Sequence, residues 1–132
     1  MRYLLDTNIV SDLVRNPAGK IAGRIGKVGA KNVCTSIIVA AELRYGADKK
    51  ESARLKSRVG LVLRALEVLP FASPADTVYG RVRAKLESAG NVIGRNDLYI
   101  AAHSLALGLI LVTDNEREFA RVEGLIFENW LR

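Results

Sequence analysis

The sequence is poor in the side chains that cross-link small proteins or bind soft metals. Its 132 residues include one cysteine, Cys34, and one histidine, His103. A single cysteine cannot form a disulfide within the chain, so a fold held together by internal disulfides is excluded. Zinc sites generally need several cysteine or histidine ligands, so a zinc centre is not expected either.

Long apolar runs are missing too. The first run, residues 3–5, ends at Asp6, and the most apolar later stretch, residues 98–113, is interrupted by polar residues. The former is too short for the apolar part of a secretory signal, and the latter is too short and too polar to span a bilayer. The sequence also contains no repeat, low-complexity segment or linker. We therefore expect one soluble, cytoplasmic domain over residues 1–132, with no membrane contact.

Basic charge, in contrast, is in excess. The chain has 20 Lys and Arg residues against 14 Asp and Glu residues, which gives a formal net charge of +6. The basic residues are spread along the chain, so we expect a broad basic surface and not a charged tail. Small basic proteins often bind polyanions, but this charge alone does not establish nucleic-acid binding.

Short apolar runs alternate with longer amphipathic segments along the whole chain. The expected strands are residues 3–5, 32–35, 67–71, 109–112 and 125–127. The expected helices are residues 7–15, 17–28, 36–45, 51–66, 73–90, 96–107 and 115–122. Continuous apolar strands that alternate with helices are typical of parallel sheets that are covered on both faces. The sequence therefore predicts an α/β fold of three layers, with a short, mainly parallel sheet of four to five strands flanked by helices.

Two acidic residues follow two of the expected strands. Asp6 comes directly after strand 3–5, and Asp114 comes at the end of the run that contains strand 109–112. Ligands of parallel sheets bind beyond the carboxyl ends of the strands. We therefore expect both carboxylates at the same edge of the sheet.

Two further acids lie on expected helices. Asp97 is in the first turn of an otherwise apolar helix, and Glu42 shares one helical face with Ile38 and Tyr45. An acid on an apolar face must be paired, protonated or bound to a cation, because burying a lone charge is costly.

Each acid also has a purely structural interpretation. Asp6 could cap a helix, Asp97 could complement a helix dipole, Asp114 could belong to a turn, and Glu42 could extend to solvent. Taken singly, the structural role is the more common one. The sheet topology nevertheless brings at least two of these acids to one edge, and this favours a shared site.

Clustered carboxylates repel one another and need positive charge between them unless they are protonated. Sites made only of carboxylate oxygens suit Mg²⁺ or Mn²⁺. Such a metal beside a basic surface indicates phosphodiester hydrolysis, because the metal lowers the pKa of a bound water and neutralises charge on the phosphate. No cysteine, histidine or lysine nucleophile is required.

Four segments of the chain resemble, in order, the acidic motifs of PIN-domain ribonucleases. They are LLDTN at residues 4–8, AELRYG at 41–46, IGRNDLYIAA at 93–102 and LVTDNEREF at 111–119. The segment 121–130 resembles VapC toxins in particular. The resemblance spans nearly the whole chain with the expected spacing, and it implies a single PIN domain.

The resemblance also implies a set of site residues. Asp6, Glu42, Asp97 and Asp114 would be catalytic residues that bind Mg²⁺, with Mn²⁺ as a plausible substitute. VapC proteins vary at the position of Asp114, where some have asparagine. Candidate groups that support these ligands by hydrogen bonds are Thr7, Asn8, Thr113 and Glu118. Glu118 also suits a helix cap, and the number of bound metals is left open.

In terms of function, the resemblance implies a Mg²⁺-dependent endoribonuclease that is the toxin of a type II toxin–antitoxin pair. Such toxins cut structured RNA, often tRNA, by means of a metal-activated water. The implied partner is a VapB-type antitoxin, and the implied assembly is a homodimer within a larger VapBC complex. Arg44 and Arg95 flank Glu42 and Asp97 in sequence, so they are candidate RNA-binding residues. Because only 6% of the residues are aromatic, we expect RNA shape and unpaired loops to set specificity.

Three alternatives were weighed against this interpretation. A haloacid-type phosphatase would need a second aspartate two residues after Asp6, where this chain has Asn8. A receiver-like protein would need adjacent acids after the first strand and a lysine after a late strand, and both are missing. A catalytically degenerate nucleic-acid-binding module would be indicated by lost acids, but all four are present.

Overall fold

The computed structural model describes residues 2–132 and confirms the alternation of strands and helices. The strands are β1 (Tyr3–Leu5), β2 (Val33–Ser36), β3 (Glu67–Leu69), β4 (Ile110–Val112) and β5 (Phe127–Glu128). The helices are α1 (Thr7–Arg15), α2 (Lys20–Val28), α3 (Ile37–Lys49), α4 (Ala53–Ala65), α5 (Ala75–Ser88), α6 (Arg95–Leu107) and α7 (Glu116–Phe119), with one 3-10 turn at Ala30–Asn32.

Several of the expected boundaries were wrong: helix α3 continues through Gly46 to Lys49, and strand β3 ends at Leu69 and not at residue 71. Three further boundaries differ for a local reason. Helix α2 begins at Lys20 and not at residue 17, because Gly19 closes a turn onto the carbonyl of Asn16 (2.9 Å). Helix α7 ends at Phe119 because the next residues form tight turns, in which the amide of Val122 donates to the carbonyl of Phe119 (3.1 Å). Strand β5 starts two residues later than expected, where the chain comes alongside β4.

All five strands are parallel, in the order β3-β2-β1-β4-β5. The first strand of the chain is therefore the central one. Its last residue, Leu5, lies opposite Thr35 of β2 and Val112 of β4. This register places Asp6 level with Thr113, and the amide of Asp6 donates to the carbonyl of Val112 (2.9 Å).

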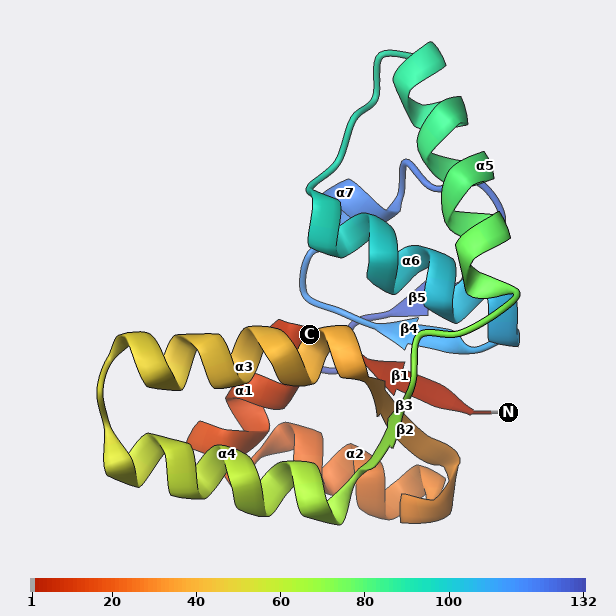
Figure 1. The fold of residues 1–132 in the computed structure, drawn as a ribbon. Coiled ribbons are helices and arrows are strands. Elements are labelled where there is room, and N and C mark those ends of the chain that lie inside the picture. The colour runs from red at the N-terminus through yellow and green to blue at the C-terminus, as the bar shows by residue number, and fades with distance from the viewer. Residues whose placement is uncertain (1) are drawn as a thin grey trace.

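Helices cover both faces of the sheet, as the sequence predicts (Figure 1). Helices α5 and α6 pack together on one side, and α2 and α4 lie on the other. Helices α3 and α4 form an antiparallel pair that extends past the sheet (Figure 1). None of the helices within residues 2–132 combines the length and apolarity that crossing a membrane requires.

The strand ends and helix starts coincide at the carboxyl edge of the sheet. Asp6 caps α1 by accepting from the amide of Thr7, and Ser36 caps α3 by accepting from the amide of Ile38. Such caps satisfy amides that have no partner within the helix. Because α1 and α3 begin directly after β1 and β2, the candidate acids near their first turns lie at the carboxyl edge of the sheet.

Candidate active site

Asp6 is the buried centre of the candidate site, with only 3% of its surface exposed. Its Oδ1 accepts from the amide of Thr7 (2.8 Å), and its Oδ2 accepts from the hydroxyl of Thr113 (2.7 Å). Burial raises the pKa of Asp6, these two hydrogen bonds lower it, and the charges of Glu42 and Glu118 raise it further. A buried carboxylate that is held in this way is rigid and close to other acids.

Glu42 connects α3 to two other helices. Its Oε1 accepts from the hydroxyl of Thr7 on α1 (2.6 Å), and its Oε2 accepts from the side-chain amide of Asn96 on α6 (3.1 Å). These contacts explain an acid on an otherwise apolar face, because both carboxylate oxygens are satisfied. Thr7 was expected among the supporting groups, whereas sequence reasoning missed Asn96. The position of Asn96 next to Asp97 was the only available signal.

Asp97 lies on the first turn of α6, beside Glu118 of α7. The side-chain amide of Asn115 donates to both acids, at 3.2 Å to Asp97 Oδ2 and 2.8 Å to Glu118 Oε2. Burial, a hydrogen bond with Glu118 and the charges of Asp6, Glu118 and Glu42 raise the pKa of Asp97 to about 8. The hydrogen bond with Asp97 in turn lowers the pKa of Glu118. Asp97 therefore holds its proton more tightly than an exposed aspartate, and Glu118 holds its proton less tightly than an exposed glutamate.

Asp114 lies apart from this cluster. Its carboxylate is exposed, and its Oδ1 accepts from the side-chain amide of Asn129 (2.9 Å) and lies 3.7 Å from Nε of Arg132. Successive residues of an extended chain point to opposite sides, so Thr113 faces Asp6 and Asp114 does not. Glu118, which was expected as a supporting group, is the acid that lies beside Asp97. The role of Asp114 as a ligand stays a prediction.

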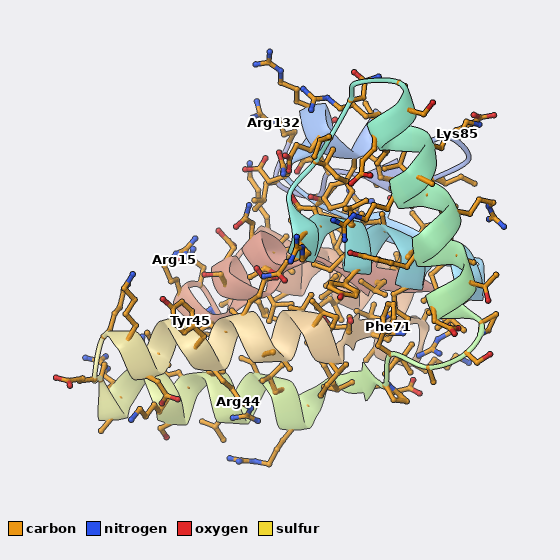
Figure 2. The ribbon with its side chains drawn as sticks, turned by 45° about the horizontal axis from the view of Figure 1, so that its top comes forward. Arg15, Arg44, Tyr45, Phe71, Lys85 and Arg132 are labelled. Atoms are coloured by element: carbon orange, nitrogen blue, oxygen red, sulfur yellow. The ribbon has the colours of Figure 1, made fainter. Side chains whose placement is uncertain are left out.

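The remaining candidates lie around this cluster. Asn8 is exposed on α1, and Arg95 is the exposed first residue of α6. Figure 2 shows that Arg44 and Tyr45 leave α3 in different directions. Arg44 extends over α4, whereas Tyr45 lies on the side of Arg15. Arg44 is therefore a weaker candidate than its sequence position beside Glu42 indicates, and the RNA-binding roles stay predictions.

The donor chemistry of the cluster fits a hard divalent cation. The carboxylates of Asp6, Glu42, Asp97 and Glu118 offer only oxygen ligands, and their mutual repulsion favours a bound positive charge. Within residues 2–132, no three His, Cys, Asp or Glu side chains are grouped so as to hold a metal ion.

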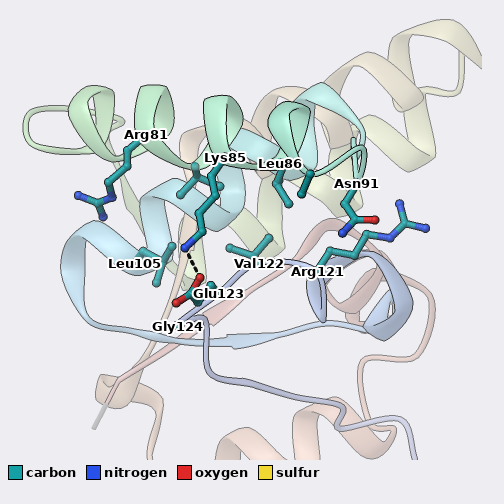
Figure 3. Close-up of a pocket in the computed structure, with 11 residues that line it drawn as sticks. Arg81, Lys85, Leu86, Asn91, Leu105, Arg121, Val122, Glu123 and Gly124 are labelled. Atoms are coloured by element: carbon teal, nitrogen blue, oxygen red, sulfur yellow. Dashed lines mark hydrogen bonds and ion pairs between the residues drawn. The ribbon is translucent and has the colours of Figure 1, made fainter.

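A cleft of about 230 Å³ adjoins the cluster between α1, α3 and α4. Thr7 and Glu42 line it near the cluster, and Arg15 and Lys50 also line it. A larger cavity of about 530 Å³ lies elsewhere, between α5 and the turn before β5 (Figure 3). None of the candidate acids lines the larger cavity. Of the candidate acids, Glu42 is the one that lines the smaller cleft.

The chain is similar in sequence to proteins of known family. Residues 3–125 match the PIN domain family. The chain is 38% identical to "Ribonuclease VapC2" of Rickettsia felis, over 98% of each chain. It is 37% identical to "tRNA(fMet)-specific endonuclease VapC" of Shigella flexneri, again over 98% of each chain.

A solved structure gives the same result for the fold. The fold superposes on a chain in the crystal structure of VapBC2 from Rickettsia felis bound to a DNA fragment from its promoter, with a TM-score of 0.91. The identity is 38%, and the match covers 98% of this chain and 99% of that one. The chain therefore belongs to the PIN-domain family and, within it, to the VapC ribonucleases.

Proposed function

We propose that this protein is a Mg²⁺-dependent endoribonuclease that cuts structured RNA, with tRNA as the first substrate to test. The observation that supports it most is the carboxylate cluster, in which burial and neighbouring acids raise the pKa of Asp97 to about 8. A site with this much unbalanced negative charge is suited to a cation. The similar protein of Shigella flexneri is named for tRNA(fMet) cleavage, and that name supports the choice of substrate.

The ligands that we propose for the cation are Asp6, Glu42, Asp97 and Glu118. A divalent cation there would supply a water that ionises near neutral pH and would balance charge on the phosphate. The protein's own part is to orient the carboxylates. Thr113 and the amide of Thr7 fix Asp6. Asn115 donates to both Asp97 and Glu118 and so holds the two carboxyl groups side by side.

We further propose that the protein is the toxin of a toxin–antitoxin pair and acts in the cytoplasm. The support is that similar solved structures are named as VapBC complexes from Rickettsia felis and Salmonella typhimurium, both bound to DNA. The proposed partner is a VapB-type antitoxin, in an assembly built on a homodimer of this chain. Production of the chain alone should stop growth, and co-production with the antitoxin encoded beside it should restore growth.

The decisive test is cleavage of tRNA by the purified protein. Cleavage should need Mg²⁺ or Mn²⁺, should stop with EDTA, and should be lost in Asp6→Asn, with circular dichroism as the control for folding. Equal cleavage by the wild type and a folded Asp6→Asn variant would refute the site. If the folded wild type cut no RNA with either metal, the proposed activity would be wrong.

A further inference from the structure

Tyr45 is the only exposed aromatic residue within residues 2–132. Its exposed fraction is 64%, the highest among the large hydrophobic side chains that the structure describes. The other tyrosines are partly buried and pair with aromatic rings. Tyr79 stacks on Tyr99 with ring centroids 4.4 Å apart, and Tyr3 contacts Trp130 at 5.2 Å. Because exposing an aromatic ring forgoes the free energy of its burial, Tyr45 is not explained by packing within this chain.

Tyr45 is close to the carboxylate cluster. It follows Glu42 by three residues on α3, so the two side chains lie on neighbouring parts of one helix surface, about 5 Å apart along the helix axis. Figure 2 shows Tyr45 on the side of α3 toward Arg15, which lines the cleft together with Glu42. The ring itself does not line that cleft. It therefore stands beside the opening and is largely exposed, with the Lys49 ammonium over the ring.

A cation accompanies the ring. Nζ of Lys49 lies 5.8 Å from the centroid of Tyr45. An aromatic surface with an adjacent positive charge is the combination with which proteins hold single-stranded nucleic acid, because the ring stacks on a base and the cation attracts a phosphate. Neither group does this alone, since isolated surface lysines mostly interact with solvent.

We propose that Tyr45 and Lys49 form a nucleobase-binding subsite that stacks an unpaired base of the RNA substrate near the bond to be cut. This proposal rests on the proposed ribonuclease function and specifies how the substrate is held. Stacking tolerates any base, because every base has a π-face. The subsite therefore selects for an unpaired nucleotide at one position, and this fits recognition of RNA by its loops.

The first experiment compares variants of Tyr45 on an RNA hairpin with an unpaired loop. Base stacking on an aromatic side chain is worth ~1–3 kcal/mol, so Tyr45→Ala should lower kcat/KM by roughly 5- to 150-fold. Tyr45→Phe and Tyr45→Trp should keep most of the activity, because both rings stack. Leu61→Ala is the matched control, since Leu61 is 60% exposed on α4 and has no part in the subsite. Equal kcat/KM for Tyr45→Ala and the wild type would overturn the proposal.

The second experiment removes the base instead of the ring. Hairpins that carry an abasic sugar at successive loop positions should reveal one position at which the wild type loses about the same factor as Tyr45→Ala. At that position Tyr45→Ala should lose nothing further, because the two changes remove one shared interaction. If the losses in kcat/KM from the abasic sugar and from Tyr45→Ala multiplied at every loop position, stacking would be refuted. If Tyr45→Ala weakened only the binding of the antitoxin, Tyr45 would be a protein contact and the proposal would be wrong.

Failure of the subsite and failure of the proposed function give different results. If the wild type cuts no RNA, the proposed ribonuclease function is refuted by the wild-type protein alone, without any variant. The subsite can still be tested in EDTA with a hairpin that carries 2-aminopurine at each loop position in turn. Binding of the wild type should quench the fluorescence at one position, and Tyr45→Ala should abolish that quenching. Identical signals for the two proteins would overturn the subsite whatever the activity is.

Discussion

Asp6 and Asp114 follow neighbouring strands in the centre of one parallel sheet, but their surroundings differ sharply. Asp6 is 3% exposed and is held by the amide of Thr7 and the hydroxyl of Thr113. Asp114 is exposed and contacts Asn129 and Arg132 near the carboxyl terminus. The comparison teaches that reaching the right edge of a sheet is not sufficient. The residue must also point to the side where the other acids lie.

The difference arises from a shift of a single residue. Leu5 pairs with Val112, the last residue of β4, so the residue that is level with Asp6 is Thr113, directly after that strand. Asp114 is one residue further along, where the side chain points away from Asp6. The chain thus places a hydroxyl donor beside Asp6, and Glu118 of α7 supplies the acid that lies beside Asp97.

The largest difference between Asp6 and Asp114 is expected in RNA cleavage, when each aspartate is replaced by asparagine in turn. Loss of a group that merely supports a metal ligand typically costs 10- to 100-fold in activity, so Asp6→Asn should lower RNA cleavage by more than ~100-fold. Asp114→Asn, which keeps the shape of an exposed side chain, should change cleavage by less than ~10-fold. Initial rates at saturating Mg²⁺ test this. Equal losses of RNA cleavage in Asp6→Asn and Asp114→Asn would show that Asp114 belongs to the active site.

A smaller difference is expected in metal affinity, when the side chains that donate hydrogen bonds to Asp6 and Asp114 are replaced. Thr113→Val removes the hydroxyl that donates to Asp6 but keeps the side-chain shape, so the affinity for Mg²⁺ or Mn²⁺ should fall by roughly 10- to 100-fold. Asn129→Ala is the matched variant, because it removes the donor to Asp114, and its metal affinity should be unchanged. Isothermal titration of the two metal-free proteins measures this. An unchanged affinity in Thr113→Val would show that the hydroxyl does not orient Asp6.

The smallest effect is expected on the stability of the metal-free protein as a function of pH. The pKa of Asp97 is raised from 3.8 to about 8 in the folded state. The folded protein therefore holds a proton that the unfolded chain has already lost, and folding stability falls as pH rises from about 4 to about 8. The pKa of Glu118 is lowered from 4.5, so this group changes folding stability with pH only below about pH 4.5. It does not offset the decrease in stability that Asp97 causes at higher pH.

Thermal melts with EDTA should therefore show Tm falling by a few degrees between pH 5 and pH 8, because solvent access to Asp97 limits the effect. Asp97→Asn should flatten this decrease, and Asp114→Asn should leave it as in the wild type. Added Mg²⁺ should raise Tm most at high pH, where the carboxylates are ionised. A pH-independent Tm in the wild type would contradict the raised pKa of Asp97.

Much of the fold follows from the sequence, because the signals are local. Short apolar runs of β1, β2 and β4 alternate with helices, and this was sufficient for a parallel sheet covered on both faces. Asp6, Glu42 and Asp97 were also found as members of one cluster. The contacts of Asp114 with Asn129 and Arg132, and those of Glu118 beside Asp97, were not foreseen, because they depend on strand register and on the short turn that starts α7. Nor could sequence reasoning assign Asn96 or Asn115, since their hydrogen bonds join distant segments.

The central position of β1 has a consequence for how the protein is made. Strand β1 is synthesised long before its neighbour β4, which comes after residue 109, and the acids of the cluster extend from residue 6 to residue 118. A nascent chain on the ribosome therefore carries Asp6 and Glu42 long before Thr113 and Glu118 exist. The cluster cannot assemble until most of the 132 residues have been translated. During its own translation, the unfinished protein therefore lacks a complete carboxylate cluster, although RNA surrounds it.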